Sequence, residues 1–250
     1  DMEIVPSKIQ LVNISGNTLE GDIFYVKNKI NYIESAKIEN TSTTIKDFFQ
    51  NNSVETKVMN SYYGSDVNTP INLKNEKTIF SDESTIETAY QYAYEKGNQK
   101  LIDANMVGIP LDTEVKKDGK TISKAETKYD NPVNLLPSSV LSYNMQSNTP
   151  STEVTYDIYD GKRNLIQYTT KAGVSTSIIW GYNQTQPIAK IEGAKLSDIT
   201  QTLINSIVNA SDDTNANYSE STLLNQLDAF RIALPNFQIS TYTYKPLIGV

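Results

Sequence analysis

Short runs in which apolar and polar residues alternate cover most of this sequence, and turn residues separate them. The run at 88–94 places three tyrosines two positions apart, which would set all three on one face of a strand. The longer run at 154–191 contains two Tyr-Asp dipeptides, a turn at Gly173 and a β-branched, aromatic segment that ends at Tyr182. Alternation interrupted by glycine turns predicts an antiparallel β-meander.

The same pattern predicts further strands and a few short helical pieces. Asp118-Gly119 is the strongest hairpin signal in the chain, because Asp-Gly favours the tight turn that joins antiparallel strands. A helical turn capped by Ser42 or Thr43 is expected at 43–49, and a short helix at 99–105. Strands are expected at 8–14, 20–26, 29–38, 53–63, 111–117, 120–129, 140–145 and 239–244.

Between residues 195 and 234 the spacing of apolar residues changes from strand to helix. Two segments with apolar residues three and four apart flank a polar loop at 211–217. Ser197 and Ser219 are the expected N-caps, and Pro235 follows the second helix. This pattern predicts an αα-hairpin inserted between two strands of one sheet. The chain is therefore mainly β, with an N-terminal β-rich region at 1–77 and a repeat-like β region at 78–250 that contains the αα-hairpin.

The Tyr-Asp motifs carry a resemblance to a known family. Tyr-Asp, a turn, Asn-Leu, Tyr-Thr, a glycine turn and a strand follow one another in 154–182, and this order resembles the Rhs/YD-repeat family of large bacterial surface and secreted proteins. The segments IIWGYNQTQPIAKIEGA and TYTYKPLIGV are similar to the version found in Bacteroidetes, and the resemblance extends over about 86–250. The family pattern is Tyr-Asp-x-x-Gly, but Arg163 occupies the usual glycine position, where a left-handed backbone would be costly for arginine.

This resemblance implies a structural function. Such repeats wind into a hollow β-cage, which commonly encloses a toxic C-terminal domain of the same polypeptide. We would then expect a curved sheet with an open or covered edge, a secreted or cell-surface location, and no catalysis by these residues. The expected partners are other parts of a longer polypeptide and a cargo or toxin domain. In the family, the segment that matches 242–244 is followed by further repeats, so a fragment of a longer chain is expected.

Composition excludes several classes of function. The 250 residues carry a net charge of −7 and their basic residues are scattered, whereas nucleic-acid binding needs a clustered cationic surface. Cysteine and histidine are both absent, which excludes thiol chemistry, histidine-dependent triads and the usual zinc sites. No apolar run is long enough to span a bilayer. The 16 tyrosines fit sheet faces that are neither fully dry nor fully wet.

One loop spaces oxygen side chains as a calcium-binding EF-hand does. In the segment 213–217, Asp213 would be the first ligand. The sixth position is Tyr218 where the motif needs glycine, and the twelfth is Leu224 where it needs glutamate. We therefore expect a solvated loop and no metal site, and nothing else in the sequence calls for a cofactor.

Pairs of acidic residues raise the possibility of carboxylate catalysis. Glycoside hydrolysis needs two acids that face each other across a cleft, but the acids here are close only along the chain. We favour turn capping over catalysis as the role of these acids, and a histidine-free glycosidase is the least favoured hypothesis. The pairs are Asp157 with Asp160, Asp212 with Asp213, and Asp82 with Glu83.

Tyrosines provide the alternative function. Tyr90, Tyr92 and Tyr94, together with Tyr182, could stack against sugar rings, which would make the chain a cell-surface adhesin that recognises a glycan or a protein. Packing against neighbouring strands is the expectation we favour for them, since cross-strand aromatic pairs stabilise sheets. Trp180, the single tryptophan, is expected to anchor the core. No catalytic, cofactor-binding or metal-binding residue is predicted, and no binding residue is assigned.

Overall fold

A computed structural model describes residues 41–49, 52–64, 70–213 and 220–244 of the chain. The strands expected at 8–14, 20–26 and 29–38 lie outside these residues, as does the expected cap Ser219. The fold described below is therefore that of the part from residue 41 onward.

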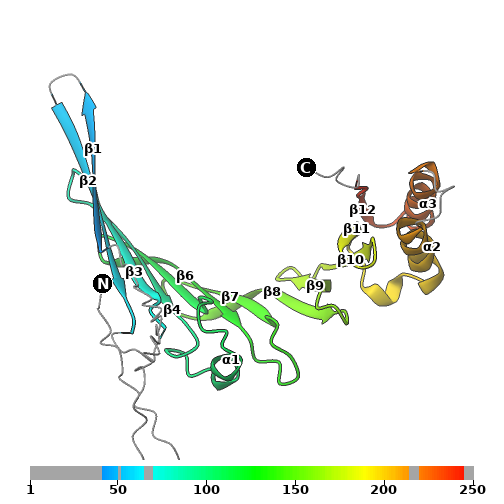
Figure 1. Ribbon diagram of the computed structural model, residues 1–250, viewed down its shortest axis with the longest axis horizontal. Helices are drawn as coiled ribbons and strands as arrows, with labels where there is room; N and C mark the ends of the chain where they lie inside the picture. The colour runs from blue at the N-terminus through cyan, green and yellow to red at the C-terminus, as the bar shows by residue number, and fades with distance from the viewer. Residues whose placement is uncertain (1–40, 50–51, 65–69, 214–219, 245–250) are drawn as a thin grey trace, which may run out of the picture. The chain divides into compact units, whose positions relative to one another are not determined.

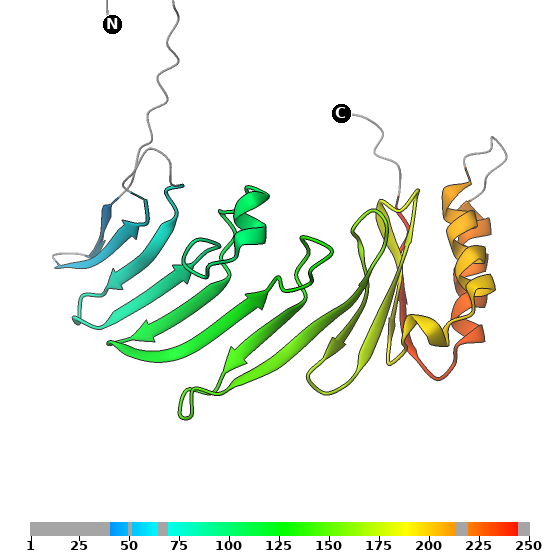
Figure 2. The ribbon, with the colours of Figure 1, turned by 90° about the horizontal axis from the view of Figure 1, so that it is seen from below.

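One antiparallel sheet of twelve strands runs through the described residues, and its strands pair in the order in which they occur in the chain. Figures 1 and 2 show this succession of neighbouring strands. The sheet is open, because the terminal strands β1 and β12 do not pair with each other, and the predicted antiparallel β-meander is confirmed. Its strands are β1 Ser42–Phe49, β2 Asn52–Tyr62, β3 Leu73–Ile79, β4 Thr85–Gln91, β5 Asp112–Lys117, β6 Lys120–Lys128, β7 Ser139–Tyr143, β8 Pro150–Tyr159, β9 Leu165–Thr170, β10 Ser175–Gly181, β11 Gln186–Glu192 and β12 Gln238–Thr241.

The expected helical turn at 43–49 is wrong, because these residues form strand β1. All eight residues of β1 pair with β2, from Ser42 opposite Met59 to Phe49 opposite Asn52. Threonine, isoleucine and phenylalanine dominate this segment, and such residues fit a pleated strand better than a helix. Pairing with the next strand of the hairpin therefore overrides the local capping signal.

The Asp118-Gly119 turn joins β5 to β6 as predicted. Both residues have positive φ, 49° at Asp118 and 78° at Gly119, as a type I′ turn requires. Beyond the turn, the register shifts between Val115 and Lys116, so that β6 contains one bulged residue. This bulge determines which side chains of the two strands share a face.

The turn between β8 and β9 places a non-glycine residue in the left-handed region. Arg163 has a φ of 71° at the position where the resembled family has glycine. Asp160 closes the turn, because its Oδ1 accepts the backbone N–H groups of Lys162 and Asn164 at 2.8 Å each. The side-chain hydrogen bonds of Asp160 hold the turn despite the unfavourable backbone at Arg163.

The predicted αα-hairpin is confirmed. It comprises the 3₁₀ turn η1 Leu196–Asp198 and the helices α2 Gln201–Asp212 and α3 Glu220–Ala233. It lies between strands that pair with each other, since Ile191 of β11 is opposite Ile239 of β12. The predicted cap Ser197 is wrong: Ser197 lies in η1, and α2 begins after Thr200. The expected short helix is also present, as α1 Gln99–Asp103.

Buried apolar side chains gather in two places. The larger cluster lies between the β10–β11 part of the sheet and helices α2 and α3, and a smaller one joins α1 to the sheet through Ala93, Leu101 and Leu111. Strands β1–β4, β7 and β8 contain no fully buried residue. Much of the described sheet is therefore a single layer. The main residues of the larger cluster are Ile179, Ile188, Ile191, Ile207, Leu223, Leu227 and Phe230.

The segment Trp180-Gly181-Tyr182 attaches helix α2 to the sheet. A Cβ atom at Gly181 would lie 2.2 Å from the Ser211 Oγ atom, so only glycine fits there. The Ser211 hydroxyl accepts the backbone N–H of Tyr182 at 3.2 Å. Trp180 is half-buried and its indole N–H donates to the Leu165 carbonyl at 2.9 Å. Trp180 belongs to neither of the two buried clusters of the described residues, so its expected place in the core is wrong, and its hydrogen bond ties β10 to β9 instead.

Candidate functional site

Two carboxylates lie side by side on one face of the sheet, where strands β5 and β6 pair. Asp112 is directly opposite Glu126, and each residue is only 4% exposed. Two buried acids this close would repel each other strongly unless cations neutralised them. The surrounding lysines meet that requirement.

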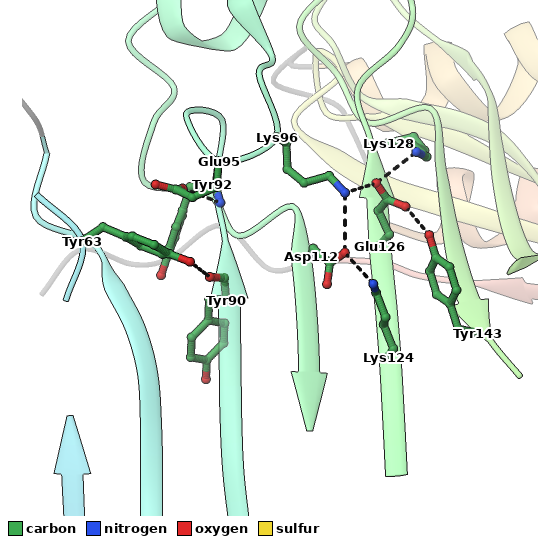
Figure 3. Close-up of polar contacts among 10 residues, drawn as sticks. All are labelled: Tyr63, Tyr90, Tyr92, Glu95, Lys96, Asp112, Lys124, Glu126, Lys128 and Tyr143. Carbon is green, nitrogen blue, oxygen red and sulfur yellow. Dashed lines mark hydrogen bonds and ion pairs between the residues drawn. The ribbon is translucent and has the colours of Figure 1, made fainter. Parts of the chain in front are cut away.

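Three lysines and a tyrosine surround the two carboxylates (Figure 3). Lys96 reaches in from the loop after β4, with its Nζ atom 2.7 Å from Glu126 Oε1 and 3.5 Å from Asp112 Oδ2. The other two lysines, Lys124 and Lys128, belong to β6 itself. Lys124 lies 3.5 Å from Asp112 Oδ2, and Lys128 lies 3.0 Å from Glu126 Oε1. We call these residues, together with Tyr143, the charged cluster.

Tyr143 completes the shell around Glu126. Its hydroxyl donates to Glu126 Oε2 at 2.6 Å. The ammonium group of Lys124 lies 4.8 Å from the centre of the Tyr143 ring, within reach of a cation–π interaction. Both oxygens of Glu126 are therefore occupied by donors.

These contacts determine how the cluster ionises. Burial by itself raises the pKa of Glu126, but the hydrogen bonds from Lys96, Tyr143 and Lys128 outweigh burial and lower the pKa to about 2. The hydrogen bond to Glu126, reinforced by burial, raises the pKa of Tyr143 to about 12. Burial lowers the pKa of Lys96, but its contacts with Glu126 and Asp112 more than offset this and raise it. At neutral pH Glu126 is therefore ionised, and Tyr143 keeps the hydroxyl proton that it donates to Glu126.

A network of this kind ties chain segments together. Lys96 belongs to the loop that connects β4 to α1, and its ammonium group binds carboxylates on both β5 and β6. An acid used in catalysis would need a pKa near the working pH, whereas the pKa of Glu126 lies far below it. The chemistry of the cluster therefore fits the fastening of a loop to the sheet.

Two hollows border the charged cluster. The larger, of about 460 Å³, lies between the loop 96–100 and the segment 126–132. The smaller, of about 200 Å³, lies over the strands next to Asp112 and Lys124. Its other lining residues are Tyr63, Lys74, Asn75, Glu87, Ala89, Tyr90, Gln91 and Glu114.

The predicted row of three tyrosines on one strand is wrong. Strand β4 ends at Gln91, so Tyr92 and Tyr94 lie beyond it. Tyr92 is only 5% exposed, whereas Tyr94 is 44% exposed. The hydroxyl of Tyr92 donates to the Leu73 carbonyl at 2.8 Å. The Tyr92 ring therefore packs against a neighbouring strand, which is the role that we favoured for these tyrosines. The tyrosines form no continuous platform for a sugar.

Sequence reasoning missed Tyr63. Its ring meets that of Tyr92 edge to face at 6.3 Å between ring centres, and its hydroxyl donates to the Tyr90 carbonyl at 3.1 Å (Figure 3). Tyr182, the fourth predicted tyrosine, lies far along the chain and packs against Tyr244. The predicted tyrosines are therefore divided between two sites.

The paired acids act as local caps and cross-strand acceptors. Asp82 accepts the backbone N–H of Ser84 at 3.0 Å, and Asp160 caps the β8–β9 turn. Asp212 accepts the backbone N–H of Asn183 at 2.7 Å. Asp157 instead accepts from Gln167 and Thr169 across the β8–β9 pairing. Turn capping is thus confirmed for Asp82 and Asp160.

Most of the EF-hand-like loop lies outside the described residues, and only Asp213 belongs to them. Within the ranges that the structure describes, no group of three or more acidic side chains is placed to hold a metal ion. In the same ranges, no helix has the length and apolar character needed to cross a membrane.

The charged cluster was also not predicted from the sequence. Asp112 and Glu126 are ordinary members of two polar, alternating strands, and Lys96 is separated from both in sequence. A partial signal was present, since the hairpin around Asp118-Gly119 was predictable. The bulge that brings the two acids to one face was not.

Comparison with protein-family models finds no family that matches this chain. Comparison with curated proteins likewise finds no significant match.

Proposed function

We propose that this chain is a non-catalytic structural segment of an Rhs/YD-repeat-like shell that encloses or presents a domain elsewhere in a longer polypeptide. The observation that carries the proposal is the topology. The strands pair strictly in chain order, and each terminal strand has an edge without a neighbour among the described strands. Such a sheet can be extended by further hairpins at either edge without rearrangement.

Two further features support a wall-like role. Much of the sheet is a single layer, as expected of a wall with two accessible faces. The Tyr159-Asp160 turn retains a left-handed residue at the position where the resembled family has glycine, with φ of 71° at Arg163. A left-handed backbone is the conformation that glycine adopts most easily, so this turn supports the proposed resemblance.

The chemistry of the acids supports a non-catalytic role. A pair of carboxylates used in acid–base catalysis needs pKa values that are pushed apart, with one raised toward neutrality. Lysine and tyrosine donors instead hold the pKa of Glu126 at about 2. A pKa this low favours a carboxylate that stays ionised and binds cations over one that transfers protons.

Secretion or display at the bacterial cell surface belongs to the same proposal, with the rest of a longer polypeptide and a cargo or toxin domain as partners. The alternative, a cell-surface adhesin that recognises a glycan or a protein through tyrosine-rich sheet faces, is less well supported because Tyr92 is buried.

Intact-mass measurement and electron microscopy of the polypeptide, purified as its native cell makes it, test the proposal. We expect a mass far above the 27.9 kDa of this chain and a hollow particle in the images. A native product that ends at Val250, or a long product without an internal cavity, would contradict the shell.

A further inference from the structure

The smaller hollow has a floor made by one small side chain among long ones. Ala89 of β4 is opposite Asn75 of β3 on one side and Glu114 of β5 on the other. Glu87 and Gln91 point to the same face of β4, since side chains two positions apart share a face. A single methyl group surrounded by four longer polar side chains leaves a cavity of about 200 Å³.

One wall of this hollow is the aromatic ring of Tyr63, which two contacts hold in place. The Tyr63 hydroxyl donates to the Tyr90 carbonyl, and the Tyr63 ring packs edge to face on Tyr92. The Lys74 ammonium group lies 5.5 Å from the centre of the Tyr63 ring. Because Lys74 is exposed, its side chain can move aside for a ligand while the ring stays fixed.

The polar groups around the hollow are mixed in kind and nearly balanced in charge. Lys74 and Lys124 oppose Glu87, Asp112 and Glu114, which leaves a net charge of −1 from two positive and three negative groups. This balance favours a neutral ligand over a strongly charged one.

Some of these groups retain unused hydrogen-bonding capacity. The side-chain amide of Gln91 is exposed and has no polar partner in the part of the chain that the structure describes. The Glu87 carboxylate accepts from Asn75 Nδ2 at 2.9 Å through Oε1, which leaves Oε2 available. Acceptors and donors therefore stand next to each other around an apolar floor.

We propose that this hollow binds a single sugar ring of a neutral glycan. Each sugar hydroxyl both donates and accepts, so adjacent amide and carboxylate groups suit it better than either alone. The Tyr63 ring and the Ala89 methyl group give the C–H face of the sugar an apolar surface. Pockets for drug-sized ligands measure about 300–1,000 Å³, so a hollow of about 200 Å³ holds one small unit and no more.

Saturation-transfer NMR on the full 250-residue chain, with the methyl glycosides of glucose, galactose and mannose as probes, tests this site. We expect transfer to at least one of the three sugars. Ala89→Leu fills the hollow and should abolish that transfer. Gln91→Ala removes one exposed partner and should weaken binding by about threefold to tenfold, the usual effect of one hydrogen bond.

Ala125→Leu is the matched control. It makes the same change at an exposed position on the opposite face of β6, so sugar binding should be unaltered. Circular dichroism checks that each variant is folded. If Ala89→Leu does not fold, the sugar binding of Gln91→Ala decides the outcome. Absence of transfer to all three sugars would overturn the proposal. Transfer that persists in a folded Ala89→Leu variant would overturn it as well. If Ala89→Leu is unfolded, a Gln91→Ala variant that binds the sugar as tightly as the parent protein would overturn it.

This site does not depend on the proposed shell. A wall segment with no sugar site would still yield a long polypeptide and a hollow particle, and a sugar site could exist on a self-contained domain.

Discussion

The hydroxyl of Tyr182 both donates to and accepts from the backbone of Tyr244, which is 62 residues further along the chain. It accepts the Tyr244 N–H at 3.1 Å and donates to the Tyr244 carbonyl at 3.4 Å. The two rings meet edge to face, with 5.6 Å between their centres, and the Tyr244 hydroxyl donates to the Pro187 carbonyl at 3.0 Å. These contacts fasten the segment after β12 to the turn between β10 and β11.

Tyr182→Phe should release this segment. The change removes both hydrogen bonds and leaves the half-buried N–H of Tyr244 without its acceptor, at a cost of about 1–3 kcal/mol. Amide hydrogen exchange should therefore become faster at Tyr244 than in the parent protein. Tyr242→Phe, at a residue that is 40% exposed, is the control and should change little. Equal protection of Tyr244 in the parent and Tyr182→Phe would contradict the fastening role.

Gly181→Ala should destabilise the packing of α2 on the sheet. The added Cβ would lie 2.2 Å from Ser211 Oγ and 2.8 Å from Ile188 Cδ1, and overpacking of this kind costs about 1–3 kcal/mol. Urea unfolding should show a correspondingly lower free energy of unfolding. Gly161→Ala is the matched control, since nothing lies within 4 Å of its Cβ position. A Gly181→Ala variant as stable as Gly161→Ala would disprove the steric argument.

Glu126→Gln should lower stability at neutral pH and remove part of its pH dependence. The folded-state pKa of about 2 lies below the usual 4.5, so ionised Glu126 stabilises the fold above pH 4.5. That contribution fades as the pH falls from about 4.5 toward 2. At pH 7 we expect the variant to lose about 1.5–3 kcal/mol, the usual worth of hydrogen bonds to a charged group.

The measurement is urea unfolding of the parent and Glu126→Gln at pH 7, 4 and 3. The difference in free energy of unfolding should narrow steadily with acid. Glu55→Gln, in the half-exposed ion pair with Lys46, is the control and should cost no more than about 1 kcal/mol. A difference that stays constant from pH 7 to pH 3 would show that the charge of Glu126 is not what stabilises the cluster.

Arg163→Gly should stabilise the protein. Arg163 has a φ of 71°, and a left-handed backbone costs a non-glycine residue about 1–2 kcal/mol. Glycine relieves this strain but is more flexible when unfolded, so we expect a net gain of about 0.5–1 kcal/mol in thermal or urea unfolding. Arg163→Ala removes the same side chain but keeps the Cβ, and it should give no gain. Equal stability of the glycine and alanine variants would count against backbone strain at this turn.

Features with a local cause could be predicted from the sequence. The Asp118-Gly119 hairpin, the meander around Gly173 and the αα-hairpin each depend on residues close together in the chain. Their signals are turn chemistry and the period of apolar residues, and both act over a few positions. The function of the chain and its candidate site had no comparable local signal.

Strand β1 and the tyrosine row show where local signals fail. The capping residues before 43–49 indicated a helical turn, but pairing with β2 extends the whole segment. The alternation at 88–94 indicated a strand with three tyrosines in line, but β4 ends at Gln91. In both cases pairing with a neighbouring strand decides where a strand begins or ends.

Sequence alone determined that an antiparallel meander would form and where several of its turns would lie. Only the tertiary structure decided which side chains meet. A bulge-free hairpin that starts with Lys117 opposite Lys120 would place Asp112 opposite Ala125, with Glu126 on the other face. The register shift at Val115 brings Glu126 opposite Asp112. Because the faces of a strand alternate residue by residue, a one-residue bulge moves every later side chain to the other face, and the charged cluster exists for that reason.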